Sequence, residues 1–463
     1  MKRKYSAPLA AAVAAALSYS QAVLPQSPPP RAHDPGVRSG PPAAGGPIAN
    51  LTPDQLTFFQ AGLADFSDVE DVADGLGPTM NLDSCSGCHA QPAVGGSSPP
   101  SNPQVAFAKK AGAHNVVPAF IHPDGPVREV RFVRNADGSA DGGVHALFSV
   151  AGRSDVSAGC AVVADDFAKA ASTGNAIFRV PTPVFGAGLI EAIPDATILA
   201  NASANAAVKR PLGIAGRPNI NVPGRVISGQ TNKNGNDGTV ARFGWKAQNK
   251  SLLLFSGEAY NVEMGVSNEL FPTERDETAN CQQATVPNDS TSTTAAAPVD
   301  AISSIVRFAM FQRLLAPPVP SADTPGGADS IGRGKSLFSS VGCALCHTPS
   351  MRTGNASIAA LRYQDVNLYS DLLVHDMGPA LADGVSQGQA SGTEFRTAPL
   401  WGLGQRLYFL HDGRTGDLLA AIGAHASGTP QQGNASEANA VVRAFGNLTE
   451  RQKQDVLNFL RSL

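Results

Sequence analysis

The sequence is poor in charged residues, which make up 16% of its 463 positions against about 25% in an average soluble protein. Lysine and arginine number 35 and aspartate and glutamate 38, so the net charge of −3 leaves no general basic surface for nucleic acid or anionic lipid. Beyond the N-terminus, no stretch approaches the roughly 18 uninterrupted apolar residues of a membrane-spanning helix. We therefore expect neither a nucleic-acid partner nor a transmembrane segment.

The first 22 residues have the layout of a secretory signal peptide. A basic start precedes an Ala-rich apolar stretch and small residues that suit cleavage after Ala22. We expect an exported, periplasmic protein, with an uncleaved N-terminal anchor as the alternative. Residues 23–50 are rich in proline and glycine and contain no aromatic residue, so they predict a disordered tether.

Two Cys-x-x-Cys-His motifs are the sharpest signals in the chain. They consist of Cys85, Cys88 and His89, and of Cys343, Cys346 and His347. Two thiols three positions apart reach the two vinyl groups of one porphyrin, and the adjacent imidazole can ligate the iron. The alternative is a single zinc ion held by all four thiolates. Export and the two following histidines favour covalent attachment of two c-type haems.

Each motif follows a predicted helix. Thr52 and Gln55 form a capping box ahead of the first motif, and Thr449 and Gln452 form another ahead of the apolar C-terminal face. Downstream of the motifs, FRVPTPVFGAG resembles FRTAPLWGLG, which indicates a duplicated module.

Residues 127–153 alternate polar and apolar positions around Gly-rich turns and predict a β-hairpin insertion. The predicted fold is therefore mainly α, with two cytochrome-c-like haem domains, β-hairpin insertions and long loops. The N-terminal haem domain with the β insertions should span 51–325, and the C-terminal one 326–463.

Five stretches resemble the bacterial diheme cytochrome c peroxidase superfamily, and most closely its branch of diheme "thiol oxidoreductases". They are GLGPTMNLDSCSGCHAQPAVGGSSP, FRVPTPVFGAGLIEAIPDA, RFGWKA, YSDLLVHDMGPALADG and FRTAPLWGLGQRLYFLHDGRTGDLLAAI. In such enzymes the N-terminal haem reacts with peroxide and the C-terminal haem passes electrons to it. The resemblance implies hydrogen peroxide or another small oxidant as substrate and a small electron donor, such as a monohaem cytochrome c or a cupredoxin. The superfamily also contains oxygenases and a protein-modifying oxidase, and a pure electron-transfer cytochrome is a further alternative.

The second haem needs an axial ligand opposite His347, and His425 is the candidate. Leu418, Ile422 and His425 lie at i, i+4 and i+7, so the imidazole should end an apolar helical stripe. The resemblance implies the same position, which in the peroxidases is usually a methionine. A histidine there should lower the haem potential. His375 and Met377 are rival ligands.

For the first haem, the resemblance makes Trp245 the electron bridge between the haems and Glu263 the distal acid or base. The spacing between them is two residues shorter than in the peroxidases, and Phe255 replaces the distal glutamine, so Glu258 or Tyr260 are alternatives. The position of the displaceable distal histidine is Val105 here. We therefore expect an open distal site, although His114 stays an alternative ligand.

Two further features distinguish this chain from the peroxidases. Arg406 and Tyr408 replace the threonine and proline that precede the His411 stretch near the calcium between the two domains, and an arginine would repel that ion and could replace its charge. Cys160 and Cys281 lie outside the motifs. In an oxidising compartment we expect a disulfide between them, with two buried thiols as the alternative.

Overall fold

The computed structural model describes residues 31–140, 150–163, 165–220, 226–227, 230–231, 240–273, 278, 280–281 and 283–463. The expected signal peptide at 1–22 lies outside these residues. Contacts divide the chain into Met1–Arg31 and Ala32–Leu463, and every helix and strand belongs to the second unit. No described helix is both long enough and apolar enough to cross a membrane. The division into two haem domains at residue 325 stays a prediction.

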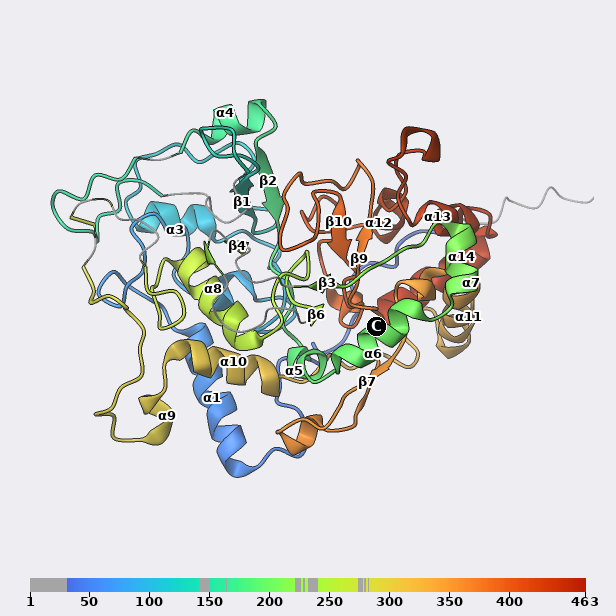
Figure 1. Ribbon diagram of the computed structural model, residues 1–463, viewed down its shortest axis with the longest axis horizontal. Helices are drawn as coiled ribbons and strands as arrows, with labels where there is room; N and C mark the ends of the chain where they lie inside the picture. The colour runs from blue at the N-terminus through green and yellow to red at the C-terminus, as the bar shows by residue number, and fades with distance from the viewer. Residues whose placement is uncertain are drawn as a thin grey trace, which may run out of the picture. The chain divides into compact units, whose positions relative to one another are not determined.

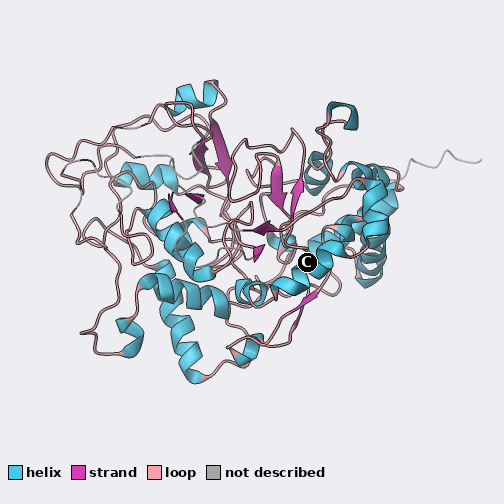
Figure 2. Ribbon diagram, viewed as in Figure 1, coloured by secondary structure: helices cyan, strands magenta, loops and turns pink. Residues whose placement is uncertain are grey.

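The structure is mainly helical, as predicted, with long loops and short strands (Figure 2). Helix α1 (Pro53–Ser67) begins at the predicted capping box, in which Thr52 and Gln55 satisfy each other's backbone N–H groups. It packs against α10 (Ser304–Leu314), which in turn contacts α8 (Leu252–Met264) (Figure 1). The approach of α1 to α10 needs Gly62, because a Cβ there would lie 2.3 Å from the carbonyl oxygen of Arg307.

Helices α11 (Ala328–Ser340) and α14 (Glu450–Ser462) form the second packed pair (Figure 1). Gly334 lets them touch, since a Cβ there would lie 1.9 Å from the carbonyl oxygen of Asp455. The capping box of Thr449 and Gln452 opens α14 as predicted.

The remaining α-helices are α2 (Cys85–Cys88), α3 (Gln104–Lys110), α4 (Phe167–Ser172), α5 (Ala187–Glu191), α6 (Asp195–Ser203), α7 (Ala206–Lys209), α9 (Pro298–Ala301), α12 (Leu418–Ala424) and α13 (Asn439–Gly446).

Short 3₁₀ turns and antiparallel strand pairs occupy the loops. The turns are η1 (Arg210–Leu212), η2 (Cys343–Leu345), η3 (Ala359–Leu361), η4 (Leu403–Gln405) and η5 (Pro430–Gln432). The strands are β1 (Glu129–Phe132) with β2 (Ala176–Arg179), β3 (Asn219–Ile220) with β6 (Val240–Ala241), β4 (Val226–Ile227) with β5 (Gln230–Thr231), β7 (Met351–Arg352) with β8 (Asp365–Val366), and β9 (Val374–Asp376) with β10 (Glu394–Arg396).

Among the described residues of the predicted hairpin at 127–153, the structure has the strand β1 and an isolated bridge between Arg134 and Ala140. All four residues of β1 pair with β2, from Glu129 opposite Arg179 to Phe132 opposite Ala176. The expected second arm includes 141–149, which lie outside the described residues. The partner of β1 thus comes from a segment more than forty residues further along the chain, which local alternation of polar and apolar residues does not reveal.

The predicted tether is wrong for residues 32–50, which pack against the C-terminal helices. The carboxylate of Asp34 forms an ion pair with Arg461 at 2.7 Å, and both side chains are buried. Asp34 also accepts a hydrogen bond from the backbone N–H of Leu418 at 2.8 Å, and the N–H of Ile48 donates to Leu314 at 2.7 Å. Polar anchors hold this segment, so its lack of aromatic residues did not indicate disorder.

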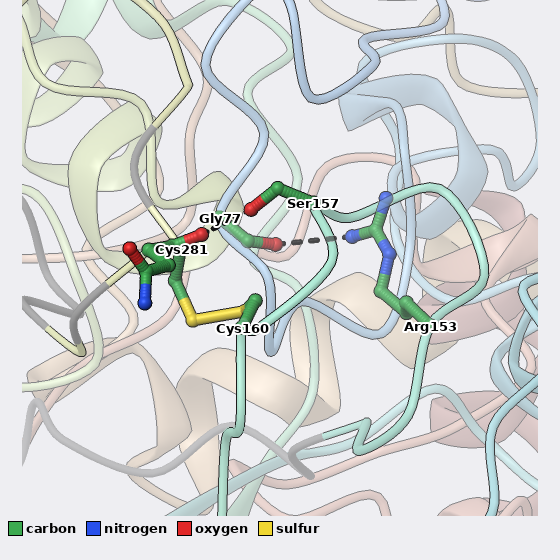
Figure 3. The surroundings of a disulfide bond; sticks show 6 residues. Gly77, Arg153, Ser157, Cys160 and Cys281 are labelled. Atoms are coloured by element: carbon green, nitrogen blue, oxygen red, sulfur yellow. Dashed lines mark hydrogen bonds between the residues drawn. A yellow bond between two sulfur atoms is a disulfide. The ribbon is translucent and has the colours of Figure 1, made fainter.

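The disulfide expected between Cys160 and Cys281 is present and joins residues 121 positions apart (Figure 3). Beside it, the hydroxyl of Ser157 donates to the carbonyl oxygen of Asn280. Arg153 donates to the carbonyl oxygen of Gly77 at 3.0 Å, which attaches the same loop to the segment before the first motif. The disulfide therefore connects the segment between β1 and α4 with the segment between α8 and α9.

Candidate functional site

Each Cys-x-x-Cys-His motif lines its own cavity. The first cavity contains Cys85, Cys88 and His89 in its wall. The second cavity contains the motif that ends at His347. A single Cys₄ zinc site is therefore wrong, because the two pairs of thiols belong to different cavities.

Local structure presents the first motif to its cavity. Helix α2 spans Cys85–Cys88 and ends at His89, and neither cysteine is in a disulfide. Apolar side chains make up much of the surrounding wall: Phe66, Leu82, Val184, Met264 and Phe308. Burial among such groups raises the pKa of the Cys88 thiol well above its usual range, which keeps it protonated. The arrangement suits the flat, apolar faces of a porphyrin.

The histidines of both motifs are set in the same way. The Nδ1 atom of His89 pairs with the carbonyl oxygen of Gly96 at 3.0 Å, and that of His347 with Tyr369 at 3.0 Å. Burial lowers both pKa values to about 4, so the rings are neutral at pH 7. A neutral imidazole that donates from Nδ1 carries its lone pair on Nε2, which is the usual arrangement of a metal-ligating histidine.

His425 lies in the wall of the second cavity together with His347. It caps the C-terminal end of α12, and Leu418 and Ile422 line the same cavity, as the helical spacing predicted. Its Nδ1 atom pairs with the carbonyl oxygen of Ala421 at 2.7 Å, and burial lowers its pKa. His425 therefore has the same tautomer-fixing contact as the two motif histidines.

The rival ligand His375 is held in a carboxylate network instead. Its Nε2 atom lies 2.9 Å from Asp371 and its Nδ1 atom 2.7 Å from Glu437. Burial opposes the charged ring, but the carboxylate of Asp371 raises the pKa of His375 well above its usual value. Both ring nitrogens are thus engaged. Met377, the other rival, lines the second cavity.

Trp245 belongs to the walls of both cavities. It also lines a small cavity, which shares Gly244 and Phe255 with the first cavity and Arg396 and Arg406 with the second. The indole Nε1 donates to the carbonyl oxygen of Val180 at 3.0 Å. This hydrogen bond therefore holds the indole at a position where it forms part of the wall of both large cavities.

Glu263 lines the first cavity, whereas Glu258 does not. Burial and the nearby carboxylate of Glu129 raise the pKa of Glu263 to about 8, although Arg131 opposes the shift. Glu258 is buried and accepts a hydrogen bond from the amide of Asn249. Of the two acids weighed from the sequence, Glu263 is the one that faces the cavity.

The other distal alternatives fall into two groups. Tyr260 and Phe255 line the first cavity, and the hydroxyl of Tyr260 donates to Glu70 at 2.6 Å. His114 does not line it, and its ring lies against Gly152 instead. Val105 packs in a separate apolar cluster around Val130 and Phe167. Neither position therefore supplies a distal histidine.

A family model described as "Di-haem oxidoreductase, putative peroxidase" matches residues 140–463. This chain belongs to the di-haem oxidoreductase family. The match begins after the first motif, so Cys85, Cys88 and His89 rest on their own sequence pattern and on the first cavity. Membership shows an oxidoreductase of the two-haem kind. The residues that would hold the haems stay predictions.

The individual proteins that match this chain are only distantly similar to it. A search of curated protein sequences finds no match. Among solved structures, hydrazine synthase of Kuenenia stuttgartiensis is 11% identical, with 96% of this chain and 99% of that chain covered and a TM-score of 0.37. A MauG-like protein associated with microbial copper homeostasis is 20% identical over 36% of this chain and 55% of that chain, with a TM-score of 0.25.

Several site residues of this di-haem oxidoreductase were not predicted from the sequence. Gln248 lines the first cavity, and its Oε1 atom is buried without a hydrogen-bond partner among the described residues. Arg131 lines the same cavity, and Arg396 and Arg406 line the second. Gln248 follows Trp245 by three residues in RFGWKAQNK, so a polar residue just after the tryptophan was the available signal.

Proposed function

We propose that this di-haem oxidoreductase reduces hydrogen peroxide at the first cavity with electrons that enter through the second. The overall reaction joins one hydrogen peroxide, two electrons and two protons into two water molecules. The observation that carries the proposal is the asymmetry of the cavities. The first contains Glu263, a buried acid with a pKa near 8, whereas the second contains His425 in addition to the motif histidine His347.

The haems would be held by the two motifs. Cys85 and Cys88 would form thioethers with one haem and Cys343 and Cys346 with the other. His89 would ligate the first iron, and His347 and His425 the second, because all three imidazoles have Nδ1 engaged with a carbonyl oxygen. When bound, the haems supply iron that can be oxidised and reduced by one electron at a time.

Glu263 would move the proton that peroxide cleavage requires. Breaking the O–O bond into two water molecules needs a proton on the oxygen that leaves, and a carboxyl group with a pKa near 8 can accept and donate it around neutral pH. Gln248 lines the same cavity with an unpaired Oε1 atom, so it could accept a hydrogen bond from the peroxide. These two side chains would orient the substrate.

Trp245 would be the electron bridge between the two sites. Its indole lines both cavities. An aromatic ring at this position would shorten the distance over which an electron has to tunnel between the two sites. The hydrogen bond to Val180 fixes the ring in that place.

The expected location and partner agree with this chemistry. A signal peptide at 1–22 would export the chain to the periplasm, and the Cys160–Cys281 disulfide suits an oxidising compartment. A small cytochrome c or cupredoxin would supply the electrons there.

The test is peroxide turnover by the haem-loaded protein. The chain is expressed in a periplasm that ligates haem, and mass spectrometry after acid–acetone extraction should find two haems retained. A reduced small cytochrome should then be oxidised on addition of hydrogen peroxide. The Cys85→Ser/Cys88→Ser variant should lose one haem and the turnover. Two bound haems without any peroxide reaction would overturn the proposal, and ligand binding then separates the alternatives. A vacant iron that takes up carbon monoxide indicates an oxygenase or oxidase, and two six-coordinate haems indicate an electron carrier.

A further inference from the structure

Two half-buried arginines of the described structure line the second cavity without a carboxylate partner. Arg396 and Arg406 contribute to the walls of the second cavity and of the small cavity beside Trp245. The Nε atom of Arg396 donates to the carbonyl oxygen of Gly244 at 2.9 Å. Among the described residues, neither guanidinium forms an ion pair. Their other donors therefore face the cavities.

Several buried cations of the described structure are paired with carboxylates: Arg179 and Lys246 with Asp383, Arg242 with Asp195, and Arg461 with Asp34. A positive charge that is shielded from water and lacks a counterion is unfavourable. Arg396 and Arg406 thus form a site that is incomplete without an anion.

Arg396 and Arg406 are both positively charged at neutral pH. Burial lowers the pKa of each to about 10, and for Arg396 the positive charge of Arg406 adds to the effect. Both guanidinium groups therefore stay protonated at pH 7 while they repel each other. An anion between or beside them would remove both the burial cost and the repulsion.

The chemistry of a guanidinium selects a planar carboxylate, which it can bind through two parallel hydrogen bonds. A haem carries two carboxylates, its propionate groups. We propose that Arg396 and Arg406 form a carboxylate-binding site that holds the propionate groups of the haem attached at Cys343 and Cys346. The inference rests on the proposed occupancy of the second cavity by that haem and adds which residues receive its polar edge.

Contacts with other segments fix the backbone at both residues before any cofactor arrives. Arg396 is the last residue of β10, which pairs with β9, and its backbone N–H donates to the carbonyl oxygen of Trp245 at 2.8 Å. Arg406 follows η4, and its carbonyl oxygen accepts a hydrogen bond from Arg461 at 2.9 Å. The contact of its Nε atom with Gly244 also holds the side chain of Arg396, which therefore loses little entropy on binding.

The pair should also set the potential of the second haem. Two histidine ligands give a lower potential than a Met/His pair. A nearby positive charge favours the reduced iron, which carries one positive charge less. Arg396 and Arg406 therefore raise the potential and partly offset the effect of His425.

The test compares charge-removing and charge-keeping variants of the haem-loaded protein. Arg396→Gln, Arg406→Gln and Arg406→Lys are made, with exposed Arg352→Gln as the control. Resonance Raman spectra report the propionate bending bands, and spectroelectrochemical titration reports the potential of each haem. We expect both Gln variants to shift the propionate bands and lower the potential of the second haem. Arg406→Lys should keep most of the potential, and Arg352→Gln should match the parent.

Other outcomes overturn the inference separately from the proposed function. Unchanged propionate bands and potentials in both Gln variants would show that the propionates bind elsewhere. A potential that follows added chloride or acetate in the parent would show that a solution anion occupies the site. If a Gln variant fails to fold, Arg406→Lys takes its place in the test. Its propionate bands must still shift, because a lysine ammonium group cannot form the two parallel hydrogen bonds of a planar guanidinium. A parent that shows these effects but does not reduce peroxide would contradict only the proposed reaction.

Discussion

The indole N–H of Trp245 donates a hydrogen bond to the carbonyl oxygen of Val180, 3.0 Å away. The same ring forms part of the wall of both motif-bearing cavities. Val180 directly follows β2, and β2 pairs with β1, so the strand pair determines where the acceptor lies. This contact fixes the aromatic group on which electron transfer between the two sites would depend.

Replacing Trp245 with phenylalanine should slow electron transfer between the haems while both haems stay bound. The smaller ring leaves a gap and cannot donate to Val180. Stopped-flow spectra should show a fast first oxidation by peroxide, followed by slower oxidation of the second haem. Trp401→Phe is the matched control, because Trp401 is buried but lines only the small cavity. Equal transfer rates in the parent and in Trp245→Phe would refute the bridge.

Glu263→Gln should slow the reaction with peroxide by about 10²–10⁴-fold, the usual loss when a general acid or base is removed. Haem content should not change, since Glu263 lies in neither attachment motif. The matched control is Glu258→Gln, a buried acid of the same helix that does not line the cavity. The assignment is reversed if Glu258→Gln slows the reaction and Glu263→Gln does not.

His425→Ala should remove the second ligand of the C-terminal iron. We expect the low-spin spectrum of that haem to be lost and its potential to change, while the N-terminal haem is unaffected. The measurement is absorption and electron paramagnetic resonance of the oxidised protein. Met377→Leu tests the rival that lines the same cavity. Met377 would be the ligand if its replacement alone abolished the low-spin signal.

Glu70→Gln should make the protein more stable at high pH. Burial raises the pKa of Glu70 to about 7 from a usual value of 4.5, so the folded state binds the proton more tightly than the unfolded state does. The stability that this proton contributes is fully present below pH 4.5 and is lost as the pH rises through 7. Glutamine stays neutral and keeps the oxygen that accepts from Tyr260.

Urea unfolding at pH 4 and pH 8 measures this effect. The variant and the parent should unfold alike at pH 4. At pH 8 the variant should be more stable by at most about 3 kcal/mol, at ~1.36 kcal/mol per pKa unit. A stability difference that does not depend on pH would show that Glu70 titrates normally.

The double variant Cys160→Ser/Cys281→Ser should lose stability without losing haem. The disulfide closes a loop of 121 residues, which in the chain-entropy model is worth about 4–5 kcal/mol. Neither cysteine lines either of the two motif-bearing cavities. Denaturant unfolding should show the loss, and reducing the parent should reproduce it. Haem loss in the variant would show that the disulfide supports a cavity.

Local sequence patterns predicted what short-range physics decides. The capping boxes at Thr52 and Thr449 were recognisable because an N-cap hydrogen bond joins residues three positions apart. The stripe that ends at His425 was recognisable because a helix places residues seven positions apart on one face. The relation of Glu263 to the first cavity came from a family resemblance and agrees with its place in the wall.

The sequence alone thus determined which residues could attach and ligate haem, because the motif spacing is set by the porphyrin itself. Only the tertiary structure decided which polar groups lie near these haem-attaching and haem-ligating residues. The burial of Asp34 against Arg461, the pairing of β1 with β2 and the exposure of Arg396 and Arg406 to one cavity all join segments far apart in the chain. Such contacts depend on long-range packing, and the local spacing of residues carries no signal for them.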